Sequence, residues 1–137
     1  MARISGSCIC GDVTYSANGK LRDIIACHCT ECRKSSGHYT ASTSVRPEDL
    51  EIQPGSHLKW YRASSEAQRG FCQQCGCSLF WKPDSGDRIS IFAGSVDGDV
   101  GLPLVAHIYL DEKGAYYDVG DDTENFATRG AHLSVEQ

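Results

Sequence analysis

The chain has 137 residues, 40% of them hydrophobic, and a formal net charge of −5 at pH 7. This length is typical of a single domain, and the acidic balance disfavours nucleic-acid binding, because affinity for a phosphate backbone depends on Lys and Arg. Residues 1–7 lack the apolar segment of a secretory signal and no apolar run is long enough to cross a membrane, so we expect a cytoplasmic protein with reduced cysteines and no membrane partner.

Short β-strands dominate the predicted secondary structure. In chain order, alternating β-branched and aromatic residues predict strands at 13–16, 39–45, 58–61, 78–81, 88–92 and 105–109. One helical turn is predicted to begin near Thr30, a candidate N-cap residue, with Glu31 and Cys32 in its first turn. The sequence therefore predicts one antiparallel all-β domain over residues 1–128, followed by a weakly ordered tail at 129–137.

The cysteines are concentrated in clusters, which favours metal binding over a disulfide framework in a reducing compartment. Thiolates two or three residues apart suit tetrahedral zinc, with sulfur about 2.3 Å from the metal. If the first two pairs lie on strands, both side chains of each pair face the same way, because residues i and i+2 share a face. The clusters are Cys8 and Cys10, then Cys27, Cys29 and Cys32, then Cys72 and Cys75.

Cys77, the eighth cysteine, decides how many sulfurs each metal receives. Two four-sulfur sites would use all eight cysteines, and both would be closed, structural sites. Four sulfurs at one site and three at the other would leave an open position, as in catalytic zinc sites. In that case Cys77 is a small buried residue that binds no metal. Spacing alone does not assign the clusters to metals.

The residues around the clusters form five stretches with a recognisable pattern: 6–15, 27–37, 71–76, 79–81 and 107–109. Together they span nearly the whole predicted domain. In this order they resemble the family of glutathione-dependent formaldehyde-activating enzymes, which also contains the centromere-protein-V-type proteins. The resemblance implies a zinc-pinned β-tent of two antiparallel sheets, with a short helical turn after the second cysteine cluster.

The resemblance also implies the metal ligands, with two zinc ions per chain. A structural zinc would be held by Cys8, Cys10, Cys72 and Cys75. A catalytic zinc would be held by Cys27, Cys29 and Cys32.

The activity that the resemblance implies is that of S-(hydroxymethyl)glutathione synthase, a carbon-sulfur lyase that joins glutathione and formaldehyde. Glutathione or another small thiol would be the partner. Three thiolates leave zinc with one net negative charge, so it is a weak Lewis acid for making hydroxide but accepts a fourth sulfur readily. We therefore expect a thiol to enter the open position and meet a small carbonyl there.

Residues near the second cluster are candidates for substrate contact. Arg33, Lys34 and Ser35 follow the last ligand directly and could hold a glutathione carboxylate. His107 lies in the family-like segment 107–109 and is a candidate for substrate contact or proton donation. His28, between two ligands, is expected to point away from the metal.

The alternative is that the protein is a non-catalytic zinc module, which binds a protein partner or a thiol ligand. It predicts two closed metal sites and no effect on the rate at which glutathione adds to formaldehyde.

Overall fold

The computed structural model describes residues 2–130, so residues 131–137 of the predicted tail lie outside the described part. None of the helices in the described range is long and apolar enough to cross a membrane. Short strands account for most of the regular structure. In chain order the elements are β1 (Ala2–Ser7), β2 (Thr14–Gly19), β3 (Ile24–Cys27), α1 (Thr30–Ser36), β4 (Thr40–Val45), η1 (Pro47–Asp49), β5 (Leu50–Ile52), β6 (Leu58–Arg62), β7 (Ala67–Cys72), β8 (Ser78–Pro83), β9 (Ile89–Phe92), η2 (Ala93–Ser95), β10 (Leu104–Ile108), η3 (Leu110–Glu112) and β11 (Glu124–Asn125).

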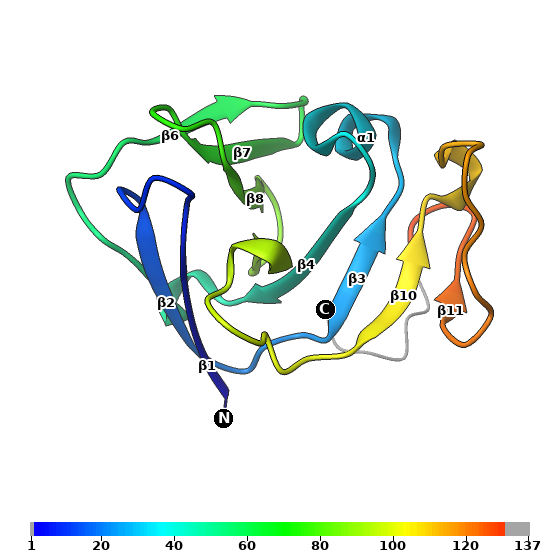
Figure 1. Ribbon diagram of the computed structural model, residues 1–137, viewed down its shortest axis with the longest axis horizontal. Coiled ribbons are helices and arrows are strands. Elements are labelled where there is room, and N and C mark those ends of the chain that lie inside the picture. The colour runs from blue at the N-terminus through cyan, green and yellow to red at the C-terminus, as the bar shows by residue number, and fades with distance from the viewer. Residues whose placement is uncertain (1, 131–137) are drawn as a thin grey trace.

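The strands form two sheets, as predicted (Figure 1). A three-stranded antiparallel sheet has the order β1-β2-β5, and an eight-stranded sheet has the order β11-β10-β3-β4-β9-β8-β7-β6. The all-β class and the β-tent architecture are confirmed. The larger sheet is mixed rather than purely antiparallel, because β10 runs parallel to both β3 and β11. Parallel neighbours need a long crossover, and most of the domain separates β3 from β10 in the sequence.

The strands predicted from alternation are all present, with small shifts at their ends, as β2, β4, β6, β8, β9 and β10. Sequence reasoning missed β1, β3, β5, β7 and β11. Strand β7 shows why: its sequence contains Arg69 and Gly70, which do not read as a buried strand. Pairing with β6 on one side and β8 on the other nevertheless fixes it as a strand.

The helix after the second cysteine cluster is confirmed, but its N-cap differs from the prediction. Cys29, not Thr30, caps α1: its backbone is extended (φ −64°, ψ 160°) and its Sγ accepts a hydrogen bond from the backbone N–H of Cys32 at 3.4 Å. A sulfur thus occupies the place that a Ser or Asp oxygen usually takes. The atom that caps the helix therefore belongs to the second cysteine cluster.

The main core lies between the two sheets and contains aromatic and branched side chains from both. The Tyr15 ring meets Phe80 edge to face at 5.2 Å between centroids, and the Tyr15 hydroxyl hydrogen-bonds Ser95 Oγ at 2.6 Å. Gly6 lies directly beneath this contact and forms an antiparallel bridge with Val96. At Gly6 the smaller sheet therefore closely approaches the segment that follows β9 of the larger sheet.

Strand β7 presents its two faces to different surroundings. Gly70 lies against Trp60 on β6, where a Cβ would be 3.0 Å from the indole ring, on the side of the main core. Because successive residues of a strand face opposite sides, Cys72 shares this face with Gly70, whereas Arg69 faces the other side. The side chain of Arg69 meets Cys32 of α1 there. One strand therefore connects the two regions that contain cysteines.

Substitution of Gly6 by Ala tests the close approach of the sheets. A Cβ on Gly6 would clash with the backbone oxygen of Ser95 and the hydroxyl of Tyr15. We expect Gly6→Ala to lower the free energy of unfolding by about 1–3 kcal/mol, as overpacking does, measured by denaturant titration in reducing, zinc-containing buffer. Gly94→Ala is the matched control, because a Cβ there meets nothing within 4 Å. Equal effects of the two substitutions would contradict the packing described here.

Candidate metal centres and their surroundings

Four cysteines from distant parts of the chain form the first cluster. Their Sγ atoms all lie within 4.8 Å of one another, with 3.5 Å between Cys8 and Cys10 and 3.7 Å between Cys10 and Cys72. Four sulfurs around one zinc ion at about 2.3 Å would be about 3.8 Å apart in a tetrahedron. Cys8, Cys10, Cys72 and Cys75 could therefore hold one metal ion with four sulfur ligands.

Two turns supply these sulfurs, not the strand face expected for the first pair. Cys8 and Cys10 lie in the turn that follows β1, where Gly11 N–H donates to the carbonyl of Cys8 at 3.1 Å. Cys72 ends β7 and Cys75 lies in the turn before β8, as expected for a turn-borne pair. The cluster thus joins the β1–β2 turn to the β7–β8 turn.

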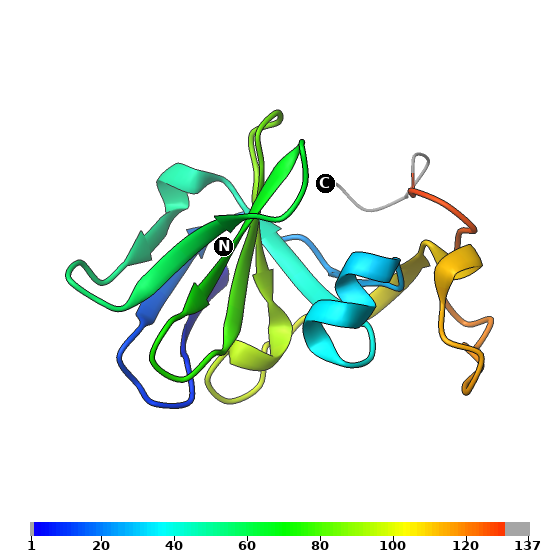
Figure 2. The same ribbon diagram turned by 90° about the horizontal axis from the view of Figure 1, so that it is seen from above.

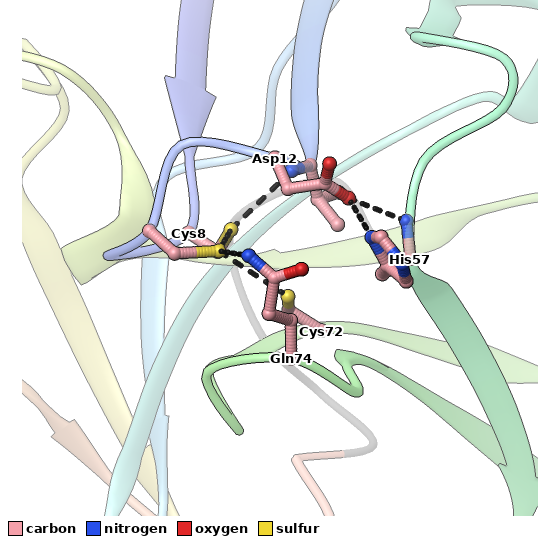
Figure 3. A network of polar contacts seen from close by, with 7 residues as sticks. Cys8, Asp12, His57, Cys72 and Gln74 are labelled. Carbon is pink, nitrogen blue, oxygen red and sulfur yellow. Dashed lines mark hydrogen bonds and ion pairs between the residues drawn. The ribbon is translucent and has the colours of Figure 1, made fainter.

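Polar contacts hold the two turns in place around the sulfurs (Figure 3). The Asp12 carboxylate accepts hydrogen bonds from the backbone N–H of His57 at 2.6 Å and from its ring Nδ1 at 2.8 Å. The Gln74 amide donates to Cys10 Sγ at 3.5 Å, and the Val13 N–H donates to Cys8 Sγ at 3.3 Å. Such donors stabilise thiolates, the form that binds metal.

The environment also favours the thiolate at Cys75. Hydrogen bonds from the backbone N–H groups of Cys10 and Cys77 lower the pKa of Cys75 to about 6. Cys77 itself accepts a hydrogen bond from the backbone N–H of Ile9 at 3.2 Å. Cys77 therefore lies beside the first cluster as a hydrogen-bond acceptor and does not join the second.

The second cluster contains three cysteines at the junction of β3 and α1. Figures 1 and 2 show the backbone of this junction. Cys27 is the last residue of β3, Cys29 caps α1, and Cys32 lies buried in its first turn. Their Sγ atoms lie within 4.8 Å of one another, and no other His, Cys, Asp or Glu among the described residues completes the group. Cys27 and Cys29 meet through the strand end and the helix cap, so the expected strand geometry for this pair is corrected as well.

Cys32 receives hydrogen bonds from within the cluster and from outside it. Hydrogen bonds from the Cys27 and Cys29 thiols lower the pKa of Cys32, and hydrogen bonds from the Thr40 and Arg69 side chains lower it further. The Arg69 contact runs from Nη2 to Cys32 Sγ at 3.5 Å. Positive charge beside a set of thiolates offsets their mutual repulsion.

Two buried His side chains and the half-buried Tyr117 support the loop between Cys27 and Cys29. His28 is fully buried, with Nε2 2.8 Å from Nδ1 of His107 and Nδ1 hydrogen-bonded to the Tyr117 hydroxyl. Burial lowers the pKa of His28 to about 4, so the ring is neutral at pH 7. Both ring nitrogens are thus engaged away from the cysteine cluster, which fits the expected orientation of His28.

The segment that follows β10 holds the start of α1 from the other side. One carboxylate oxygen of Glu112 accepts from both the backbone N–H and the hydroxyl of Thr30, each at 2.9 Å. The backbone carbonyl of Glu112 accepts from Arg33 Nη1 at 3.0 Å. Figure 2 shows this segment, in gold, beside α1, in cyan.

The predicted substrate-binding residues have different surroundings. Arg33 is half-buried and binds Glu112 with one nitrogen, and Lys34 is exposed. The Ser35 hydroxyl donates to the carbonyl of Cys32 at 3.2 Å. His107 is buried and paired with His28. Arg33, Lys34 and Ser35 therefore lie on α1 next to the three cysteines, while His107 supports the loop that contains His28.

Sequence reasoning missed two residues beside the second cluster. Arg69 is far from these cysteines in the sequence, and only the pairing of β7 places it there. Tyr109 is the one described non-glycine residue with a positive φ, 57°, a conformation that often marks functional sites. Burial raises the pKa of Tyr109, and charge on Cys27 and Cys29 adds to the effect. The segment 107–109 was noted in the sequence, but not this backbone geometry.

Comparisons with known proteins agree with these observations. The family model described as glutathione-dependent formaldehyde-activating enzyme matches residues 3–112. A protein of Schizosaccharomyces pombe, named as an uncharacterized lyase, is 27% identical over 138 residues, which cover 98% of this chain and 98% of that protein. A crystal structure of a Rhodobacter sphaeroides protein superposes with a TM-score of 0.59 at 22% identity, covering 74% of this chain and 99% of the other. This last likeness shows the fold.

Replacing one cysteine in each cluster separates their roles. We expect Cys75→Ser to prevent stable folding, because metal binding at a four-sulfur site that joins two distant turns is part of the folding free energy. Cys29→Ser should leave a folded domain, because the three-cysteine cluster spans only six residues at one strand end. Circular dichroism and denaturant titration of both variants in reducing, zinc-containing buffer measure the difference. Similar loss of folding in both variants would contradict this division.

Proposed function

The chain belongs to the glutathione-dependent formaldehyde-activating enzyme family, and from this premise we propose that it is a zinc-dependent lyase of the S-(hydroxymethyl)glutathione synthase type. In this proposal it adds the thiol of glutathione to formaldehyde or a related small carbonyl. Membership of the family and the lyase name of the yeast relative support a lyase-type function.

One observation carries the proposal: the clustered cysteines divide into a group of four and a group of three. Cys77 could have been the fourth cysteine of the second group, but it lies beside the first group. A closed four-sulfur site is structural, whereas a site with three protein ligands keeps a position for a reactant. The same division disfavours the alternative of a non-catalytic module with two closed sites.

The donor sets fit zinc. Both clusters present only sulfur, at separations that suit tetrahedral coordination, and soft thiolates in this geometry are typical of zinc sites. We assign a structural zinc to Cys8, Cys10, Cys72 and Cys75, and a catalytic zinc to Cys27, Cys29 and Cys32. When bound by three thiolates, zinc supplies a fourth position that takes a soft sulfur ligand and favours its deprotonated form.

The surrounding residues fix where a thiol would react. The contacts of His28 with His107 and of Thr30 with Glu112 hold the segment on either side of Cys29. Fixed positions of this kind lower the barrier by bringing two reactants together in one orientation. The sulfur lone pair then forms the C–S bond, the C=O π pair moves to oxygen, and that oxygen takes up a proton in place of the one the thiol lost.

Arg33 and Lys34 are the proposed contacts for the glutathione carboxylates. Both lie on α1 immediately after the three cysteines, and Lys34 is exposed. Arg33 keeps N–H groups beyond the one that binds Glu112. Ser35 donates to the carbonyl of Cys32 and contributes through the position of the helix turn. We place His107 among the residues that support the His28 loop.

Exchange NMR tests the proposed activity. In a mixture of glutathione and formaldehyde at equilibrium, the zinc-loaded protein should raise the exchange rate between free formaldehyde and S-(hydroxymethyl)glutathione above the spontaneous rate. Cys29→Ser should return the rate to the spontaneous value while the domain stays folded. Lys82→Gln, a substitution at an exposed site on β8, is the control and should keep the rate of the unchanged protein. A zinc-loaded protein that gives no rate above the background would refute the proposal.

A further inference from the structure

Next to the second cysteine cluster, Arg69 has a buried nitrogen atom that no described residue pairs with. The residue is 5% exposed, and its Nη1 makes no hydrogen bond with any described residue. The other terminal nitrogen, Nη2, donates to Cys32 Sγ at 3.5 Å. Most buried side-chain polar atoms have at least one hydrogen-bond partner, and leaving a charged donor unpaired costs stability. Nη1 is therefore placed to meet an acceptor that residues 2–130 do not provide.

The position of Arg69 restricts what that acceptor can be. Nη1 and Nη2 are bonded to the same carbon of the rigid planar guanidinium, so Nη1 lies close to the nitrogen that contacts Cys32 Sγ. Cys32 Sγ is in turn within 4.8 Å of the sulfurs of Cys27 and Cys29. A ligand at Nη1 must be small, since so little of Arg69 is exposed, and it must carry a hydrogen-bond acceptor such as a carbonyl oxygen.

The net charge of the second cluster also restricts the charge of a ligand at Nη1. Three thiolates around a divalent ion carry one net negative charge, which the guanidinium of Arg69 balances. A second full anion is thus not required at rest, and a neutral carbonyl oxygen can occupy the position. Negative charge that develops on this oxygen during reaction would strengthen its hydrogen bond with Nη1. Interactions that strengthen in this way accelerate a reaction.

We propose that Nη1 of Arg69 binds the carbonyl oxygen of the one-carbon electrophile and stabilises the alkoxide that forms when the thiolate sulfur attacks its carbon. The identity of this ligand rests on the proposed function. In the step, the C–S bond forms, the π pair of the carbonyl moves to oxygen beside Nη1, and the alkoxide then takes a proton from solvent to replace the one released by the thiol. Arg69 stays protonated throughout.

A direct binding experiment tests the site without turnover. Formate is a one-carbon molecule with anionic oxygens, so it mimics the alkoxide. We expect ¹³C-formate, followed by NMR, to bind the zinc-loaded, reduced protein. The Arg69→Met variant should bind it at least tenfold more weakly. Arg62→Met is the matched control, because Arg62 is an exposed arginine on the neighbouring strand that pairs with Asp84; its affinity for formate should equal that of the unchanged protein.

The zinc content of each variant is measured in parallel, and Arg69→Lys, which keeps the charge but not the fork, replaces Arg69→Met if the latter loses metal. Absence of formate binding to the unchanged protein, or weakening by less than tenfold in the variant, would overturn the proposal. Loss of zinc in both Arg69 variants would also overturn it, since Arg69 would then serve only to hold the metal cluster.

Kinetics separate this proposal from the proposed function. Arg69→Met should lower kcat/KM for formaldehyde by about 100-fold or more, as removal of one donor to a developing oxyanion does, with KM for glutathione unchanged. If the unchanged protein does not accelerate the reaction but formate binding still depends on Arg69, the proposed function fails while the oxygen-binding site stands. If the reaction is accelerated equally with Met at position 69, the function stands and the role of Arg69 is refuted.

Discussion

The contact between the two sulfur-bearing turns, one after β1 and one after β7, is the constraint on which the rest of the molecule depends. The turns are more than sixty residues apart in the sequence, and Cys8, Cys10, Cys72 and Cys75 bring them within a few ångströms. A chain with 40% hydrophobic residues and many short strands would gain stability from the zinc that we assign to these sulfurs. The contact joins the end of β1 to the end of β7, and the opposite face of β7 meets the second cluster.

The second cluster depends on this arrangement for its surroundings more than for its ligands. Its three cysteines are local, since a strand end and the first turn of a short helix supply all of them. The fold adds contacts from segments that are distant in the sequence. Arg69 comes from β7, Glu112 comes from the segment after β10, and His107 reaches His28 because β10 pairs in parallel with β3. Contacts from distant segments around only three cysteines distinguish this cluster from the group of four.

Much of the fold and the site could be predicted from the sequence, and the remainder could not for identifiable reasons. Cysteine spacing is a local signal, so the clusters and the helix after Cys29 were predictable. Alternation found β4 and β9, but not β7, where Arg69 and Gly70 depart from the pattern and only neighbouring strands define the element. The direction of β10 and the position of Arg69 depend on contacts between distant segments, which no local pattern encodes.

The most direct test of the account is the number of metal ions and sulfur ligands per chain, measured by elemental analysis and X-ray absorption on the reduced protein with and without glutathione. We predict two zinc ions that share seven protein sulfurs, and a gain of one sulfur when glutathione is added. Two ions with eight sulfurs in the absence of glutathione would show two closed sites, and no gain of sulfur on its addition would show that the thiol does not reach the metal. Either result would contradict the account.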